Sequence, residues 1–141
     1  MKILKNIATT CLVALSISAF AKDEPASKKL SIDYALKTYI SAFSEGKIKE
    51  LPGVLDNDVK FTVTRGDQIV NYTRSEILSS IKPSENIQQN CITDYAIVDQ
   101  NPNQAIVKVT MKYETFKKIN FVTMSNTAKG WKITNVSSSY N

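Results

Sequence analysis

The sequence of 141 residues contains no histidine. This absence excludes catalytic arrangements that depend on an imidazole base, and it excludes zinc and iron sites that need histidine ligands. Asp56 and Asp58 lie two residues apart, but neither the glycine nor the distal glutamate of a calcium-binding loop follows them. The sequence therefore predicts no metal site and no cofactor, and it assigns no residue a catalytic role.

Cysteine is nearly as scarce, with only Cys11 and Cys91 in the chain. Cys11 lies in an N-terminal leader and is expected to be lost with it. Cys91 then has no partner for a disulfide within the chain. In an oxidising compartment its thiol is expected to be either buried or bridged to a second chain, and the sequence leaves both open.

The first 21 residues have the pattern of a secretory signal peptide. Lys2 and Lys5 provide a positive start, an apolar run from 7 to 20 follows, and the segment ends in Ala-Phe-Ala. The run is shorter than the ~20 apolar residues that a membrane-spanning helix needs. We therefore expect residues 1–21 to be cleaved and residues 22–30 to form a flexible tether. The mature protein would be periplasmic or secreted, with no membrane contact.

Basic residues are in modest excess. The net charge is +5, and removal of the two leader lysines leaves sixteen basic and thirteen acidic side chains. The pairs Lys28-Lys29 and Lys117-Lys118 stand apart, and no stripe of arginine and aromatic residues joins them. Because nucleic-acid-binding surfaces need such clustering, we predict a mixed, solvated surface and no nucleic-acid partner.

A long amphipathic helix is predicted between Ser31, a suitable N-cap, and Gly46, a suitable residue after the last turn. A short second helix is expected over 47–51. The capping box over 73–76 opens a third helix, which Pro83 closes. The apolar stripe of the first helix has helical spacing and consists of Ile32, Leu36, Tyr39, Ile40 and Phe43.

The rest of the chain alternates apolar and polar residues in the manner of strands. After a turn at Asp56-Asn57-Asp58, one strand is predicted over 59–65 and a short one over 68–72. Further strands joined by short turns form an antiparallel meander, whose outer face usually stays in water. These further strands are predicted over 87–98, 105–114, 119–125 and 131–138.

One predicted strand carries apolar residues on both of its faces. Ile119 and Phe121 point one way, whereas Val122 and Met124 have the opposite parity. This pattern indicates that the outer face of the sheet is covered. A second copy of the protein, a helix or the tail of the chain could cover it, and we expect a homodimer through the sheet.

The order of these elements resembles that of the nuclear transport factor 2-like superfamily, and most closely its SnoaL-like and "putative lumazine-binding" bacterial members. The segments 39–46, 55–61 and 130–136 carry the resemblance, which covers 32–138. It implies an α+β cone over residues 31–141. In such a cone a curved antiparallel sheet wraps around the N-terminal helix and leaves an apolar pocket, commonly in a dimer packed through the sheet.

Ketosteroid isomerase, another relative in that superfamily, shows what its chemistry requires. It uses a carboxylate base, a tyrosine and a protonated aspartic acid. By ungapped comparison, Tyr39 falls on the tyrosine, Val63 on the base and Asn120 near the aspartic acid. Because valine cannot abstract a proton, that reaction is disfavoured.

Three hypotheses follow for the function. The first is an exported, non-catalytic protein that binds a small apolar or aromatic molecule. The second is an isomerase or lyase that uses Asp94 with Tyr39, although Asp94 is expected to face water while Tyr95 packs in the core. The third is a dimeric interaction module with a filled pocket. In the first hypothesis the ligand-binding residues are Tyr39 and Asn120 as polar contacts and Phe43, Val63, Met111 and Trp131 as apolar walls.

Overall fold

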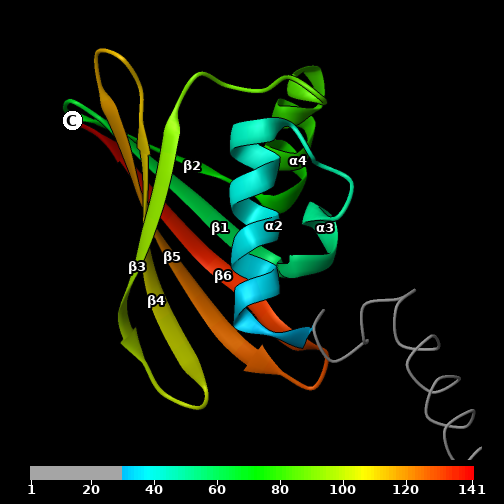
Figure 1. The fold of residues 1–141 in the computed structure, drawn as a ribbon. Helices are drawn as coiled ribbons and strands as arrows, with labels where there is room; N and C mark the ends of the chain where they lie inside the picture. Colours follow the sequence, from blue (N-terminus) through cyan, green and yellow to red (C-terminus); the bar gives the residue numbers. More distant parts are fainter. Residues whose placement is uncertain (1–29) are drawn as a thin grey trace, which may run out of the picture.

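The computed structural model describes residues 30–141 (Figure 1), so the predicted signal peptide and all but the last residue of the predicted tether lie outside the described residues. Within this range, no helix has the length and apolar character needed to cross a bilayer. The helices are α2 (Ile32–Glu45), α3 (Leu51–Val54), α4 (Arg74–Ile81) and the 3-10 helix η2 (Lys82–Ser84). The strands are β1 (Leu55–Arg65), β2 (Gln68–Tyr72), β3 (Ile92–Gln100), β4 (Gln104–Lys112), β5 (Lys117–Thr127) and β6 (Gly130–Tyr140).

The strands form one six-stranded sheet in the order β2-β1-β6-β5-β4-β3. All neighbours are antiparallel except β1 and β6, which pair in parallel. The prediction of a purely antiparallel sheet was therefore wrong at this one pair. The reason is topological: the first and last strands of the domain lie side by side, and local sequence patterns carry no information on such a distant pairing. The helices lie on one side of the sheet (Figure 1).

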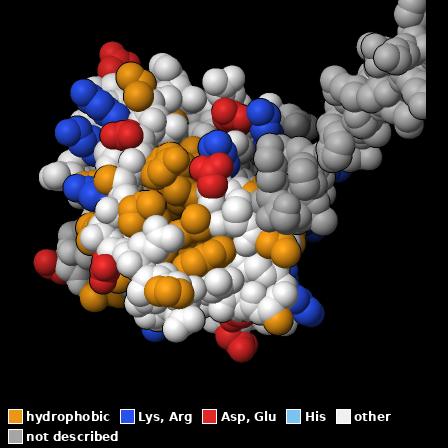
Figure 2. Space-filling view, turned by 60° about the horizontal axis from the view of Figure 1, so that its bottom comes forward, with side chains coloured by type: hydrophobic (Ala, Val, Ile, Leu, Met, Phe, Trp, Pro, Cys, Tyr) orange, Lys and Arg blue, Asp and Glu red, His pale blue; other side chains and the backbone are white. Residues whose placement is uncertain are grey.

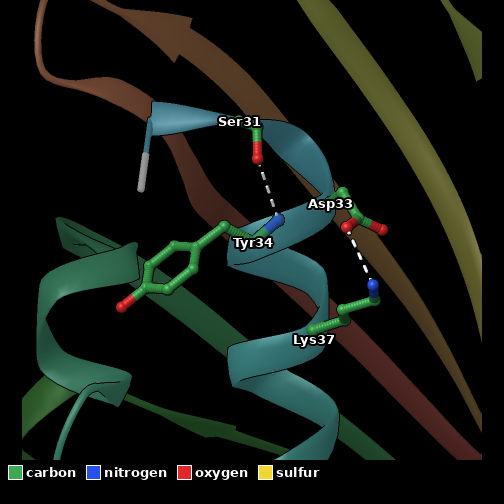
Figure 3. A network of polar contacts seen from close by, with 4 residues as sticks. All are labelled: Ser31, Asp33, Tyr34 and Lys37. Carbon is green, nitrogen blue, oxygen red and sulfur yellow. Dashed lines mark hydrogen bonds and ion pairs between the residues drawn. The ribbon is translucent and has the colours of Figure 1, made fainter. Parts of the chain in front are cut away.

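Helix α2 begins and ends as its sequence predicts. The Ser31 side chain accepts a hydrogen bond from the Tyr34 amide at 3.1 Å, and Lys37 forms an ion pair with Asp33 at 3.0 Å (Figure 3). Such an exposed pair contributes only ~0.3–0.5 kcal/mol, so the cap is the stronger start signal. Gly46 ends the helix in the left-handed conformation, with φ of 71°.

The core lies between α2 and the concave face of the sheet. From α2, Leu36 and Tyr39 are buried, and from β4, Val107, Val109 and Met111 are buried while their neighbours on the strand face outward. The α+β cone is thus confirmed, with alternating strand residues directed toward the helix.

Three segments differ from their predicted structure. Residues 56–58 belong to β1 and not to a turn, because Leu55 pairs with Ile133 and the pairing is irregular between Leu55 and Lys60. The strand predicted over 87–98 begins later than expected. It is β3, which begins at Ile92, because backbone hydrogen bonds tie residues 86–89 to the end of α2. The short second helix lies at Leu51–Val54, later than expected.

The outer face of the sheet carries exposed apolar side chains. Val122 and Met124 are fully buried on the inner face, whereas Phe121 is 41% exposed on the other. Ile106 lies diagonally beside Phe121, since Ile106 pairs with Thr123 and Lys108 pairs with Phe121. None of the helices in residues 30–141 covers this face (Figure 1).

Candidate functional site

Of the six predicted ligand-binding residues, four lie in or pack against the hydrophobic core, namely Tyr39, Phe43, Met111 and Trp131. Tyr39 and Phe43 project from α2, and Met111 lies on the inner face of β4. Val63 and Asn120 both pair with Ser138, so they share one row of the inner face.

Trp131 packs against the same core but lies at the other end of β6. It stands near the start of β6, nine residues before Tyr140, which corresponds to about 30 Å of extended strand. Trp131 therefore does not share a pocket with the residues at the other end of this strand.

Asn120 is held by contacts within the protein. It is completely buried, its Nδ2 donates to the Val109 carbonyl at 3.4 Å, and its Oδ1 accepts a bond from the Ser138 hydroxyl at 2.6 Å. Since a buried amide must be satisfied in this way, its main effect is to join three strands. Asn120 has little capacity left for a ligand.

Tyr39 differs from Asn120, because its hydroxyl makes no hydrogen bond to any residue in 30–141. Only 1% of the side chain is exposed, and its ring packs on Phe43 with centroids 4.8 Å apart. Burial raises the pKa of Tyr39 well above its ordinary value, and the nearby Tyr140 adds to this rise. The phenol is therefore neutral and available as a hydrogen-bond donor.

Two cationic residues were not predicted, and they lie on the inner face at the end of the sheet where β6 ends. Lys118 of β5 pairs with Met111 on one side and Tyr140 on the other, and Arg65 ends β1 next to Tyr140. The Lys118 Nζ lies 5.6 Å from the centre of the Phe43 ring and 6.0 Å from that of Tyr140. We call Tyr39, Phe43, Arg65, Lys118 and Tyr140 the mouth cluster.

Arg65 completes the mouth cluster at its exposed rim. Its Cζ lies 5.0 Å from the centre of the Tyr140 ring, and its Nη2 donates to the Tyr140 hydroxyl at 3.4 Å. Within residues 30–141, the ion pairs are Lys37 with Asp33 and Lys47 with Glu45. Neither cation of the mouth cluster is neutralised by a carboxylate there.

Lys118 has an unusual electrostatic environment for a lysine. Burial lowers the pKa of Lys118, the positive charge of Arg65 lowers it further, and only Tyr140 opposes the shift. Strand parity could have identified this residue, because Lys118 and Asn120 have the same parity as the buried Val122 and Met124.

Further aromatic residues extend the mouth cluster along the β4–β5 turn. The Phe116 ring stacks on Tyr113 at 4.6 Å and lies 6.0 Å from the Tyr140 ring. The Tyr113 hydroxyl donates to Gln89, and burial, with the half-buried thiol of Cys91 nearby, raises the pKa of Tyr113 to about 12. A hollow of about 340 Å³ is lined by residues 112–117 of this turn and by Asn141, and not by the five residues of the mouth cluster.

Asp94 lies on the outer face of the sheet. It pairs with Thr110, is exposed, and accepts a hydrogen bond from the Tyr95 amide at 2.8 Å. Because Tyr39 is on the inner side, the carboxylate and the phenol are separated by the sheet. The hypothesis of an acid–base pair between Asp94 and Tyr39 was wrong for this geometrical reason.

Tyr95 faces inward as expected but does not join the core. It pairs with the buried Val109, yet it is 41% exposed, because β3 is an edge strand and α2 packs against β6. Ile97, in the next inner row, is 50% exposed for the same reason. Figure 2, which views the molecule from the end with the β3–β4 and β5–β6 turns, shows hydrophobic side chains gathered in the middle of that face.

The fold is shared with several solved bacterial proteins. An NTF2-like protein of unknown function from Silicibacter pomeroyi has a TM-score of 0.65 at 12% identity, covering 84% of this chain and all of its own. An NTF2-like protein of unknown function from Shewanella baltica has a TM-score of 0.64 at 10% identity, and the match covers 85% of this chain and 98% of that protein. An NTF2-like protein from Rhodospirillum rubrum is described as of unknown function in nutrient uptake. It has a TM-score of 0.61 at 17% identity, and the match covers 78% of this chain and 98% of that protein. No curated protein matches the sequence significantly.

A family model matches almost the whole of the described domain. The match spans residues 27–140, and the family is described as "Putative lumazine-binding". The resemblance expected from the sequence is therefore confirmed at the level of both family and fold. This chain belongs to the "Putative lumazine-binding" family, and it has the fold of NTF2-like proteins.

Proposed function

We propose that this is an exported protein that binds a small aromatic molecule at the mouth cluster without transforming it. The observation that carries this proposal is Tyr39, whose ring is buried beside the Phe43 ring and whose hydroxyl has no hydrogen-bond partner among residues 30–141. A phenol hydroxyl with no protein partner can donate a hydrogen bond to a bound ligand.

The surroundings of Tyr39 favour an aromatic ligand. Aromatic rings in offset or tilted contact gain about 0.5–1.5 kcal/mol beyond their buried area, and Phe43 and Tyr140 offer two such rings. The family description names lumazine, a planar heteroaromatic molecule, and this makes lumazine a concrete first candidate.

Two observations support a protein that binds its ligand without transforming it. In the ungapped sequence comparison with ketosteroid isomerase, Val63 falls on the position of the base, and in the structure Asp94 lies on the other side of the sheet from Tyr39. Export is supported by the signal-peptide pattern of residues 1–21. The mature protein is proposed to be periplasmic or secreted.

Native mass spectrometry of protein purified from its own host tests this proposal. We expect a retained small molecule that is released on denaturation, and an intact mass that lacks residues 1–21. Tyr39→Phe should weaken ligand retention by about 3- to 10-fold, because it removes one neutral hydrogen bond worth ~0.5–1.5 kcal/mol. Tyr34→Phe, on the same helix but outside the mouth cluster, is the matched control. A ligand-free protein, or equal affinities for both variants, would contradict the proposal.

We propose in addition that a second copy of the chain covers the outer face of the sheet. Phe121 and the neighbouring Ile106, which is 38% exposed, form an apolar centre on a face that no helix of residues 30–141 covers. A pair of identical faces would bury both centres at once.

Sedimentation velocity tests the dimer. Phe121→Lys should convert the protein to a monomer at micromolar concentration, because it places a charge in the centre of the interface. Ile87→Lys, which changes an exposed apolar residue away from the sheet, should leave the dimer intact. A wild-type protein that sediments as a monomer would refute this assignment.

A further inference from the structure

We infer that the mouth cluster recognises an organic anion, an aromatic acid whose acidic group is held by the Lys118 ammonium and the Arg65 guanidinium. This inference deepens the proposed function and rests on it. It adds the charge of the ligand, which neither the family description nor the fold specifies.

The first argument is the uncompensated positive charge. Lys118 and Arg65 flank Tyr140 in one row of the sheet, and neither has a carboxylate partner among residues 30–141. The two like charges repel each other, and burial removes much of the water around Lys118, whereas Arg65 stays exposed. A bound anion would relieve both effects.

The second argument is the position of the Lys118 ammonium. It lies between two rings, 5.6 Å from the centre of Phe43 and 6.0 Å from that of Tyr140. A cation over aromatic faces is stabilised, but less than a cation with an anionic partner. We expect the flexible Lys118 side chain to swing outward when the ligand enters. The aromatic part of the ligand would then take the place between the two rings.

The third argument is Tyr39, whose ring packs on Phe43, the same ring that the Lys118 ammonium faces. Hydrogen bonds to an ionised acceptor are roughly twice as strong as those between neutral groups. The mouth cluster thus combines two cations and a neutral phenol donor, and it contains no acidic side chain that would oppose an anion.

Two fluorescent probes with one aromatic skeleton test this inference. 8-Anilinonaphthalene-1-sulfonate carries a negative charge, and N-phenyl-1-naphthylamine lacks the sulfonate and is neutral. We expect the sulfonate to bind wild-type protein at least about tenfold more tightly than the neutral probe, because a hydrogen bond to a charged group contributes ~1.5–3 kcal/mol. This preference should fall as salt is added.

Single substitutions test which side chains cause the preference for the sulfonate probe. Lys118→Met should bring the two affinities to within about threefold of each other, since the neutral probe loses little while the sulfonate loses its main contact. Arg65→Gln should reduce the preference in part, and its exposed position makes misfolding a poor explanation of the loss. Lys112→Met, on the outer face at the same end of the sheet, removes an equal charge and should leave the preference unchanged.

The outcomes separate this inference from the proposed function. If both probes bind wild-type protein equally, the aromatic site stands and the anion site is refuted. An unchanged preference in Lys118→Met, with Lys112→Met equally tight, would refute the role of Lys118. If neither probe binds, both the inference and the proposed aromatic site fail.

Discussion

Replacing Gly46 with alanine is expected to lower the free energy of unfolding by about 3 kcal/mol or more. Gly46 has φ of 71°, a conformation that costs a residue with a Cβ roughly 1–2 kcal/mol. A Cβ at this position would also lie 2.4 Å from the Ser84 carbonyl oxygen and 2.6 Å from the Asn86 nitrogen. Both are backbone atoms, so the clash cannot be relieved by rotating a side chain, and overpacking of this kind costs a further ~1–3 kcal/mol.

The Gly46 substitution also threatens the connection that leads to β3. The Asn86 amide donates to the Gly46 carbonyl at 2.9 Å, and the Gln89 amide donates to the Ser44 carbonyl at 2.8 Å. These bonds attach the segment before β3 to the end of α2. A shift of either backbone would weaken both.

Two other glycines, Gly66 and Gly53, provide matched controls in urea unfolding. Gly66 has φ of 56° but open space around its missing Cβ, so Gly66→Ala should cost only about 1 kcal/mol. Gly53 has open space, no positive φ and a helical position, so Gly53→Ala should be neutral or stabilise by up to ~1 kcal/mol. Equal losses for Gly46→Ala and Gly66→Ala would show that the close approach to Ser84 does not exist in solution.

Lys118→Met is expected to raise the free energy of unfolding at neutral pH by about 1–2 kcal/mol while it abolishes the anion preference. Methionine keeps the length and apolar body of the side chain but removes a buried charge that has no carboxylate partner. Most substitutions of binding residues lose affinity without a gain in stability. If Lys118→Met gains stability but loses the preference for the anionic probe, Lys118 is a residue that serves binding at a cost in stability.

The stability gain should depend on pH in a defined direction. Burial lowers the pKa of Lys118 in the folded protein below its ordinary 10.5. Below the folded pKa both states carry the proton, so the cost of the buried charge is constant. As the pH rises from the folded pKa toward 10.5, the unfolded state holds more protons, so the wild type gains stability relative to Lys118→Met. The gap between the two proteins should therefore narrow.

Urea unfolding of both proteins at neutral and alkaline pH measures this gap. The raised pKa of Tyr39 acts in the opposite direction above its ordinary 10.0, but it is common to both proteins and cancels in the difference. Lys112→Met, at an exposed site, serves as the control and should show a constant gap. A Lys118→Met variant less stable than wild type at neutral pH would mean that its ring contacts outweigh the cost of burial.

Local patterns predicted the secondary structure well where a single element supplied the signal. The Ser31 cap, the apolar stripe and Gly46 define α2 within its own sequence, and the Thr73 capping box starts α4 in the same way. Alternation identified the strands because the side-chain period of a strand is two, whatever its neighbours are. The segment at 56–58 failed because three polar residues resemble a turn, while the pairing of Leu55 with Ile133 draws them into β1.

The candidate site was predictable only in part. Tyr39 and Phe43 lie on the apolar stripe of α2, so the helix alone directs them inward. Lys118 could have been assigned to the inner face by parity, but a lysine in such a position is usually taken as exposed. Its contact with Tyr140, and the distance of Trp131 from both, depend on which strands are neighbours and in which register.

The sequence by itself determined the amphipathic helix after Ser31, the alternation of the strands and the lack of any imidazole, because each is a property of neighbouring residues or of composition. Only the tertiary structure decided that β1 runs parallel to β6 and that Asp94 and Tyr39 lie on opposite sides of the sheet. It also decided that Lys118 and Arg65 both lie beside the Tyr140 ring. The physical reason is that parity along a strand is local, whereas partner and register are set by the packing of the whole sheet against α2.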